Sequence, residues 1–200
     1  MGNGSAPLPY DAEIEYLQSS GTQYINTGVS ISYDLRVVVI VNIISIAKTK
    51  TTHFFGGRSV TSGGDGYGIS TADGKLLSDY FGSRATIYST CPTNRWLNID
   101  KNKNIVIVDG TTTTNTASTS TEPERNVYLF GFDAPAYNGG YSGTIRYSQA
   151  KIYKNDNLIL DLIPVRVGQI GYMYDRVSGT LFGNAGTGSF ALGPDINQQP

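Results

Sequence analysis

The chain has 200 residues, and 15 Lys and Arg oppose 16 Asp and Glu, so the formal net charge is -1. This length fits one domain, and a domain of this size buries a full core without disulfides or structural metals. The near-neutral balance, with no basic block, excludes a surface dedicated to nucleic acid.

Residues 1–12 are polar and contain two glycines and two prolines, which predicts a flexible N-terminal arm. Two roles fit this arm: an unstructured leader and a tether to a larger assembly. The segment has neither the basic region nor the apolar region of a secretory signal, so we expect synthesis in a cytoplasm without export by the general secretory route alone. We expect the folded domain over residues 13–193 and a loose tail over 194–200.

Short strands are expected around Ile14 to Leu17 and from Tyr24 to Gly28, and the longest apolar run follows at Leu35 to Ala47. Valine and isoleucine dominate this run and favour a strand, and the run is shorter than the roughly 20 residues that span a bilayer. Alternation places one apolar set on each face. A strand with one solvent-exposed face would alternate apolar and polar residues, and this run does not. We therefore expect a second sheet on one face and a loop, arm or neighbouring subunit on the other. The sequence therefore predicts a possible homo-oligomer through the outer face of this strand.

The middle of the chain alternates strand patterns with turn signals. Strands are expected at residues 52–58, 67–70, 75–81, 84–89, 96–99 and 104–108, with hairpin turns at Asp73-Gly74 and Asp109-Gly110. The low-complexity run from Thr111 to Glu124 is typical of a disordered spacer or glycosylated stalk, but threonine after a hairpin turn favours an exposed edge strand that frays into a loop.

The last third continues this pattern. We expect a buried strand at residues 126–132, a Gly-rich loop at 133–143, paired strands at 144–153 and 157–165, and a closing hairpin formed by 172–174 and 180–182. No stretch shows a sustained helical period. The sequence predicts an all-β, two-sheet antiparallel β-sandwich with very little helix.

Three segments carry a family resemblance: EYLQSSGTQYINTG at 15–28, IRYSQAKIYKNDNLILDLIPVR at 145–166 and MYDRVSGTLFGNAGTGSF at 173–190. Together with the Asp109-Gly110 turn they resemble the concanavalin A-like, laminin-G-like jelly-roll domains of bacteriophage structural proteins and gut-bacterial surface proteins. The resemblance spans about residues 13–193. It implies two stacked antiparallel sheets and either glycan binding or a role in virion architecture, while the scaffold alone fixes no function.

Enzymes on this scaffold are glycoside hydrolases, which need paired carboxylates across the scissile bond. On one strand this requires alternating acids, but the four glutamates lie at the edge of the domain and in a loop: Glu13, Glu15, Glu122 and Glu124. We therefore expect no enzyme. The single histidine, His53, is expected to be a structural residue at the start of a strand rather than a catalytic base. The single cysteine excludes an internal disulfide and a Cys/His zinc site.

No cofactor is expected. Calcium is the one metal that deserves a test, because Asp65 and Asp133 sit in Gly-rich loops where their oxygens could converge. Aspartates in such loops usually serve as turn residues.

Carbohydrate binding is the leading functional hypothesis, because sugar rings stack on aromatic side chains while amides and carboxylates bind the hydroxyls. One candidate site is the loop with Asp133, Tyr137, Asn138 and Tyr141, since loops on rigid sandwiches often carry binding sites. The second candidate site comprises Arg58, Asp65 and Tyr67. Trp96 could serve the same role, but a lone tryptophan between Arg95 and Leu97 is more often part of the core, where we expect it.

The competing hypothesis is a structural module without a glycan ligand. In either case we expect a non-catalytic adhesion or assembly module of a virion or a bacterial surface, with a cell-surface glycan or a partner protein as its binding partner. No nucleic acid and no membrane insertion are expected.

Overall fold

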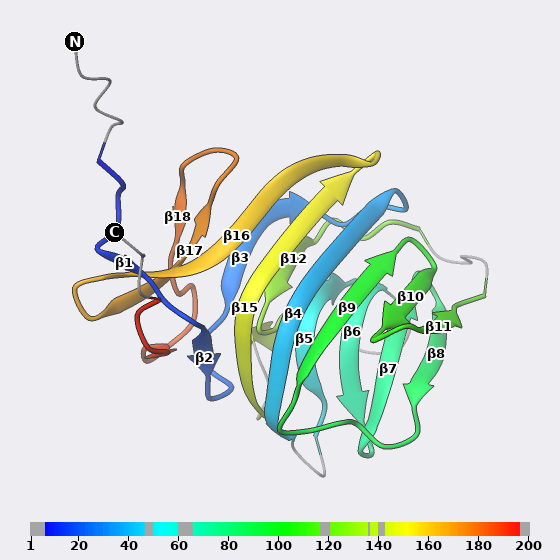
Figure 1. Cartoon of the computed structure of the whole chain (residues 1–200). Coiled ribbons are helices and arrows are strands. Elements are labelled where there is room, and N and C mark those ends of the chain that lie inside the picture. The colour runs from blue at the N-terminus through cyan, green and yellow to red at the C-terminus, as the bar shows by residue number, and fades with distance from the viewer. Residues whose placement is uncertain are drawn as a thin grey trace.

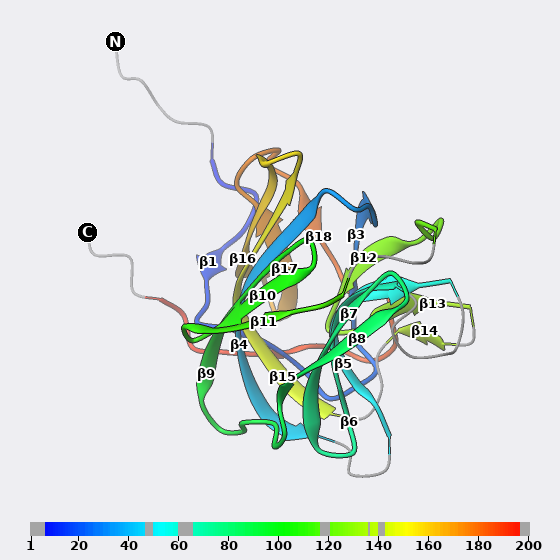
Figure 2. The ribbon, with the colours of Figure 1, turned by 90° about the vertical axis from the view of Figure 1, so that its right-hand side faces the viewer.

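The computed structural model describes residues 7–46, 50–59, 66–116, 121–135, 137–139 and 143–196. Within these ranges the chain has no helix and forms two packed sheets (Figures 1 and 2), which confirms the predicted all-β sandwich. Among the described residues there is consequently no helix long and apolar enough to cross a membrane.

The larger sheet lies in front in Figure 1 and is built around the long strand β4. Its order is β11 (Thr111–Thr114), β10 (Ile105–Val108), β9 (Trp96–Asn102), β4 (Leu35–Ile46), β15 (Gly143–Lys154), β16 (Asn157–Val167), β17 (Ile170–Asp175) and β18 (Leu181–Phe182). Three short strands extend it: β1 (Ala12–Glu13) on β16, β2 (Leu17–Ser19) on β15, and β19 (Ala191–Leu192) on β2.

The smaller sheet lies behind and has the order β14 (Tyr137–Gly139), β13 (Phe132–Ala134), β5 (Thr52–Arg58), β6 (Gly66–Ala72), β7 (Lys75–Tyr80) and β8 (Ser83–Tyr88). Strand β12 (Asn126–Leu129) pairs with both β5 and β3 (Ile25–Ser30). Among the described strands, every pair is antiparallel except β13 with β5, which is parallel.

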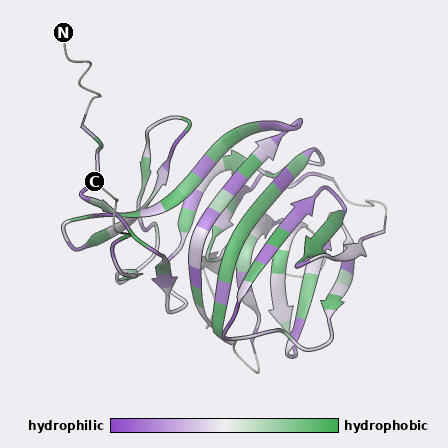
Figure 3. Cartoon of the chain, in the orientation of Figure 1, coloured by the Kyte–Doolittle hydropathy of each residue, from purple (hydrophilic) through white to green (hydrophobic). Residues whose placement is uncertain are grey.

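Strand β4 confirms the expectation for its inner face. Figure 3 shows it as hydrophobic along most of its length, and its alternate side chains are fully buried between the sheets: Leu35, Val37, Val39, Val41 and Ile43. On the outer face Val38, Ile40 and Ile44 are only half-buried. Neighbouring side chains of the same sheet shelter them in part, and no described strand lies over them as a further layer.

The hairpin turns follow the sequence closely. Asp73 and Gly74 have φ values of 51° and 75°, and Asp109 and Gly110 have 47° and 85°. Positive φ at both central positions is the turn geometry that matches the strand twist of a two-residue hairpin. The threonine run forms β11 at the edge of the larger sheet, as predicted.

Three expectations need correction. The strand predicted at 126–132 is two strands, β12 and β13, separated at Phe130 with φ 62°. The loop predicted from 133 begins inside β13, which pairs with β14. Part of the predicted arm and tail is also docked: Ala12 pairs with Arg166 in β16, and Asp195 bridges to Ile14.

Two buried tyrosines tie the sheets together. Tyr67 on β6 donates its hydroxyl to the carbonyl oxygens of Lys101 (2.6 Å) and Leu35 (3.2 Å), and Tyr147 on β15 donates to the carbonyl oxygen of Phe54 on β5 (2.8 Å). Burial raises the pKa of both phenols, so both stay protonated donors at neutral pH.

Tyr67→Phe should lower the free energy of unfolding by about 1 kcal/mol, because it leaves buried carbonyl oxygens without this donor. Urea unfolding measures the change. Tyr172→Phe is the matched control. Tyr172 is half-buried, and its hydroxyl makes no hydrogen bond within the described part of the chain, so its loss should leave stability unchanged. Equal midpoints for wild type and Tyr67→Phe would contradict the inter-sheet role.

Candidate functional site

The structure does not bring the residues of the second predicted site together at the surface. Tyr67 is fully buried in the core and its hydroxyl is used by the backbone of the opposite sheet, so a sugar cannot reach it. Arg58, at the end of β5, is 7% exposed. Asp65 lies outside the described residues. The prediction failed for Tyr67 because the strand alternation of YGIS does not say which face points inward.

The first predicted site is described only at Asp133. This residue lies in β13 rather than in a loop and is 8% exposed. Its carboxylate accepts the backbone N–H of Asn126 at 2.9 Å and pairs with Arg125 at 3.4 Å. The side chains of Tyr137 and Asn138, and all of Tyr141, lie outside the described residues.

Calcium needs several oxygen ligands that converge on one point. The carboxylate of Asp133 is already bonded to protein donors, and the described residues contain no cluster of three or more His, Cys, Asp or Glu able to hold a metal. We therefore expect a chelator such as EDTA to leave the thermal midpoint unchanged. A midpoint that falls with EDTA and recovers with Ca²⁺ would contradict this expectation.

A different set of side chains meets on the outer face of the larger sheet. Trp96 on β9 lies opposite Asn42 on β4, Asn42 lies opposite Arg146 on β15, and Arg146 lies opposite Gln18 on β2. Because neighbouring strands are about 4.8 Å apart, this row crosses four strands within about 15 Å. We call Tyr16, Gln18, Asn42, Trp96 and Arg146 the Trp96 cluster.

Trp96 corrects a prediction, since it is 41% exposed rather than in the core. Its neighbour Leu97 takes the inward position at 0% exposure, so alternation turns the indole outward. Tyr16 lies beside it, with ring centroids 6.5 Å apart. The indole is thus an open apolar surface in a polar neighbourhood.

Tyr16 and Arg146 hold each other in place. The guanidinium carbon lies 4.2 Å from the centre of the Tyr16 ring, and the Arg146 Nε–H donates to Gln18 Oε1 at 2.7 Å. Gly193 donates its N–H to the Tyr16 carbonyl, and a Cβ at Gly193 would stand 2.8 Å from the Tyr16 backbone nitrogen. The close approach of Gly193 therefore helps to position the Tyr16 backbone, and with it the Tyr16 ring.

A shallow groove of about 360 Å³ lies further along the same face. Val38 and Ile107 contribute apolar walls, while both carboxylate oxygens of Asp100 bind Arg36, at 2.9 and 2.6 Å. From Trp96 to Asp100 along β9 is about 13 Å at 3.3 Å per residue. The cluster and the groove thus form one elongated surface.

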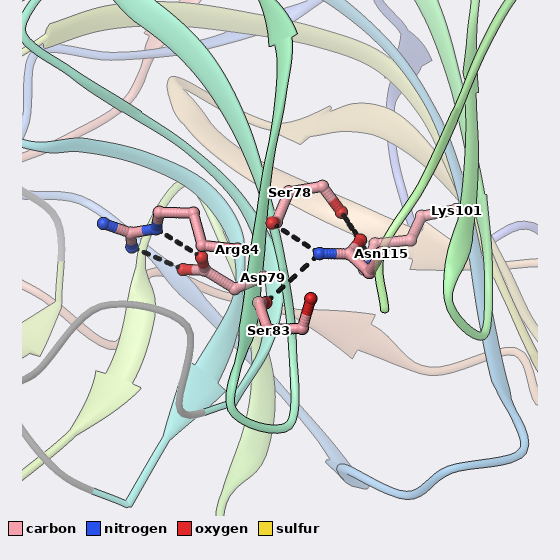
Figure 4. A network of polar contacts seen from close by, with 6 residues as sticks. All are labelled: Ser78, Asp79, Ser83, Arg84, Lys101 and Asn115. Atoms are coloured by element: carbon pink, nitrogen blue, oxygen red, sulfur yellow. Dashed lines mark hydrogen bonds and ion pairs between the residues drawn. The ribbon is translucent and has the colours of Figure 1, made fainter. Parts of the chain in front are cut away.

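The interior holds a charged residue that the sequence analysis missed. Lys101 is fully buried between the sheets, and its Nζ donates to Ser78 Oγ at 2.8 Å, 4.7 Å from the centre of the Tyr67 ring. Figure 4 shows Lys101 within the polar network that links Ser78, Asn115 and Ser83, with the Asp79–Arg84 pair beside it. Burial lowers the pKa of Lys101 to about 7, and the charge of Asp79 opposes this shift.

His53 lies near the start of β5, where a structural residue was predicted, and is 2% exposed. Its ring centre lies 4.3 Å from that of Phe132. Burial, with the charges of Arg58 and Arg84, lowers the pKa of His53 to about 3, so the imidazole is neutral near pH 7. Its burial denies a substrate direct access to the ring.

No family model and no curated protein matches this sequence significantly. A similar solved structure carries the name "putative carbohydrate binding protein" and comes from Bacteroides ovatus ATCC 8483, with a TM-score of 0.59 and 11% sequence identity. The match covers 90% of this chain and 60% of that chain, so this chain spans about three fifths of that protein's length. At this identity the likeness supports the fold alone.

Proposed function

We propose that this chain is a non-catalytic carbohydrate-binding module whose site is the Trp96 cluster and the adjoining groove. The exposed indole of Trp96, held in one row with Asn42 and Arg146, is the observation that carries the proposal. An aromatic face beside amide and guanidinium donors suits a sugar, which presents C–H faces and hydroxyls. The carbohydrate-binding name of the Bacteroides ovatus protein with a similar fold adds support.

The groove carboxylates favour binding over hydrolysis. A retaining or inverting glycosidase needs two carboxyl groups free to act on the scissile bond. Asp100 is bonded through both oxygens to Arg36, and Asp109 pairs with Arg95 at 3.1 Å and accepts the N–H of Asn98 at 2.9 Å. These contacts leave the carboxylates in structural roles.

A glycan array, followed by affinity electrophoresis in soluble polysaccharides, tests the proposal. We expect retention in at least one polysaccharide without release of reducing ends. A blank array and unretarded migration throughout would overturn the binding function, and new reducing ends would overturn its non-catalytic character.

The second candidate function is assembly through the same face. On this face β4 carries half-buried Val38 and Ile40, and β10, on the far side of β9, carries Ile105 and Ile107, which are 43% and 39% exposed. Apolar side chains exposed in this way suit a second copy of the chain. Light scattering tests this second function. A dimer that Ile107→Ser weakens would support assembly through this face, and a protein that stays monomeric at high concentration would rule out assembly of the chain with itself.

We place such a module on a virion or a bacterial surface, where an adhesion domain would meet glycans. The support is the sequence resemblance to phage and gut-bacterial surface domains. Capsid, tail or surface-assembly genes beside this one would support the setting, and a neighbourhood of unrelated metabolic genes would oppose it.

A further inference from the structure

The guanidinium of Arg146 has unused hydrogen-bonding capacity. Arginine carries five N–H donors, and only the Nε–H of Arg146 has a hydrogen-bond acceptor among the described residues, namely Gln18. The Tyr16 ring lies against the guanidinium and limits its rotation. The four N–H groups of Nη1 and Nη2 thus remain available for a ligand.

The charge of Arg146 is also uncompensated, in contrast to the other arginines of this face. Arg36 pairs with Asp100, and Arg176 pairs with Asp161 at 2.8 Å. Within residues 7–46, 50–59, 66–116, 121–135 and 143–196, no carboxylate pairs with Arg146, and its cross-strand neighbours Asn42 and Gln18 are neutral amides. The Trp96 cluster therefore carries a net positive charge.

The side chain of Asn42 gives a second indication of a ligand at the Trp96 cluster. Asn42 is nine-tenths buried between Trp96 and Arg146, and its Oδ1 has no hydrogen-bond partner within the described residues. A buried amide oxygen without a donor is destabilising, because it has lost its hydrogen bond to water without replacement. Because the oxygen itself is enclosed, a ligand hydroxyl between the indole and the guanidinium would supply that donor once the Asn42 amide turns outward.

We propose that the Trp96 cluster recognises an acidic carbohydrate, with Arg146 binding the carboxylate of a uronic acid or another sugar acid. The planar guanidinium matches the two oxygens of a carboxylate in a fork-to-fork pair, while the sugar ring stacks on Trp96. This inference rests on the proposed function and specifies its ligand class.

The test compares polygalacturonate with the same polymer after reduction of its carboxyl groups, by affinity electrophoresis and titration calorimetry. The panel also includes uronate polymers of other linkages, each with its carboxyl-reduced form. Dextran sulfate, compared with neutral dextran, tests whether negative charge alone is enough for binding without a carboxylate. We expect at least one uronate polymer to bind at least tenfold more tightly than its reduced form. The difference should shrink with added salt.

Arg146→Gln should lower the affinity for the uronate polymer much more than the affinity for its reduced form, and so remove most of this preference. Arg146→Lys, which keeps the charge without the fork, should retain an intermediate preference. The matched control is Lys75→Gln, which removes an exposed charge on β7 of the other sheet and should change nothing. Thermal melts confirm that each variant is folded.

The outcomes separate this inference from the proposed function. Binding of neutral polymers alone, or a uronate preference that survives Arg146→Gln, would overturn the acidic ligand and leave carbohydrate binding in place. Dextran sulfate that binds as tightly as the best uronate would overturn carboxylate recognition. Absence of binding across the panel and the glycan array would overturn both.

Discussion

Trp96→Ala should weaken binding of the preferred carbohydrate about 30-fold, which corresponds to about 2 kcal/mol and is the usual loss for an aromatic residue at the centre of a binding surface. The indole supplies the largest open apolar face of the cluster, and alanine leaves the sugar without a stacking partner. Because the indole is 41% exposed and lies outside the core, its removal should cost little stability. Titration calorimetry measures the affinity, and a thermal melt measures the stability.

Two matched variants sharpen this result. Trp96→Phe keeps a smaller ring and should retain part of the affinity. Val177→Ala removes an apolar side chain that is 54% exposed in the turn after β17, and should bind as the wild type does. Wild-type affinity in Trp96→Ala, with the protein folded, would place the carbohydrate elsewhere on the molecule.

Lys101→Met should abolish a pH dependence of stability between pH 7 and 8.5. The pKa of Lys101 is about 7 in the folded protein and 10.5 in the unfolded chain. In this window the unfolded chain binds a proton that the folded protein does not, so the free energy of unfolding of the wild type rises with pH. The rise approaches 1.4 kcal/mol per pH unit and amounts to about 2 kcal/mol over the window.

Below pH 7 both states bind the proton, so the wild type keeps the full cost of burying the charge. Methionine fills a similar volume without a titrating group and should be stabilising at pH 7 and below. Urea unfolding at a series of pH values measures the slope. Lys103→Met, which removes a neighbouring exposed lysine, should keep the wild-type slope, and an unchanged slope in Lys101→Met would assign the titration to another group.

The elements of this protein were largely readable from local sequence. The run from Leu35 to Ile46 alternates correctly between faces, and the Asp-Gly pairs mark their turns because positive φ at both central positions is a local property. The break at Phe130 was missed because one glycine, Gly131, inside an apolar run does not by itself mark the end of a strand. The break is needed because β12 runs antiparallel to β5 while β13 runs parallel to it.

The candidate site was not readable in the same way. Trp96, Asn42, Arg146 and Gln18 each sit in an ordinary strand pattern, and no short segment joins them. The contact between Arg146 and Gln18 links positions 128 residues apart. The pattern of aromatic residues in and beside Gly-rich loops pointed instead to residues such as Tyr67, whose ring belongs to the core.

The sequence by itself determined that the chain forms short β-branched strands with tight turns, because those preferences act between neighbouring residues. Only the tertiary structure decided which tyrosines are buried, that Lys101 is enclosed, and that Trp96 faces outward in the same row as Arg146. These outcomes depend on strand order and register, which bring together side chains that no local pattern relates.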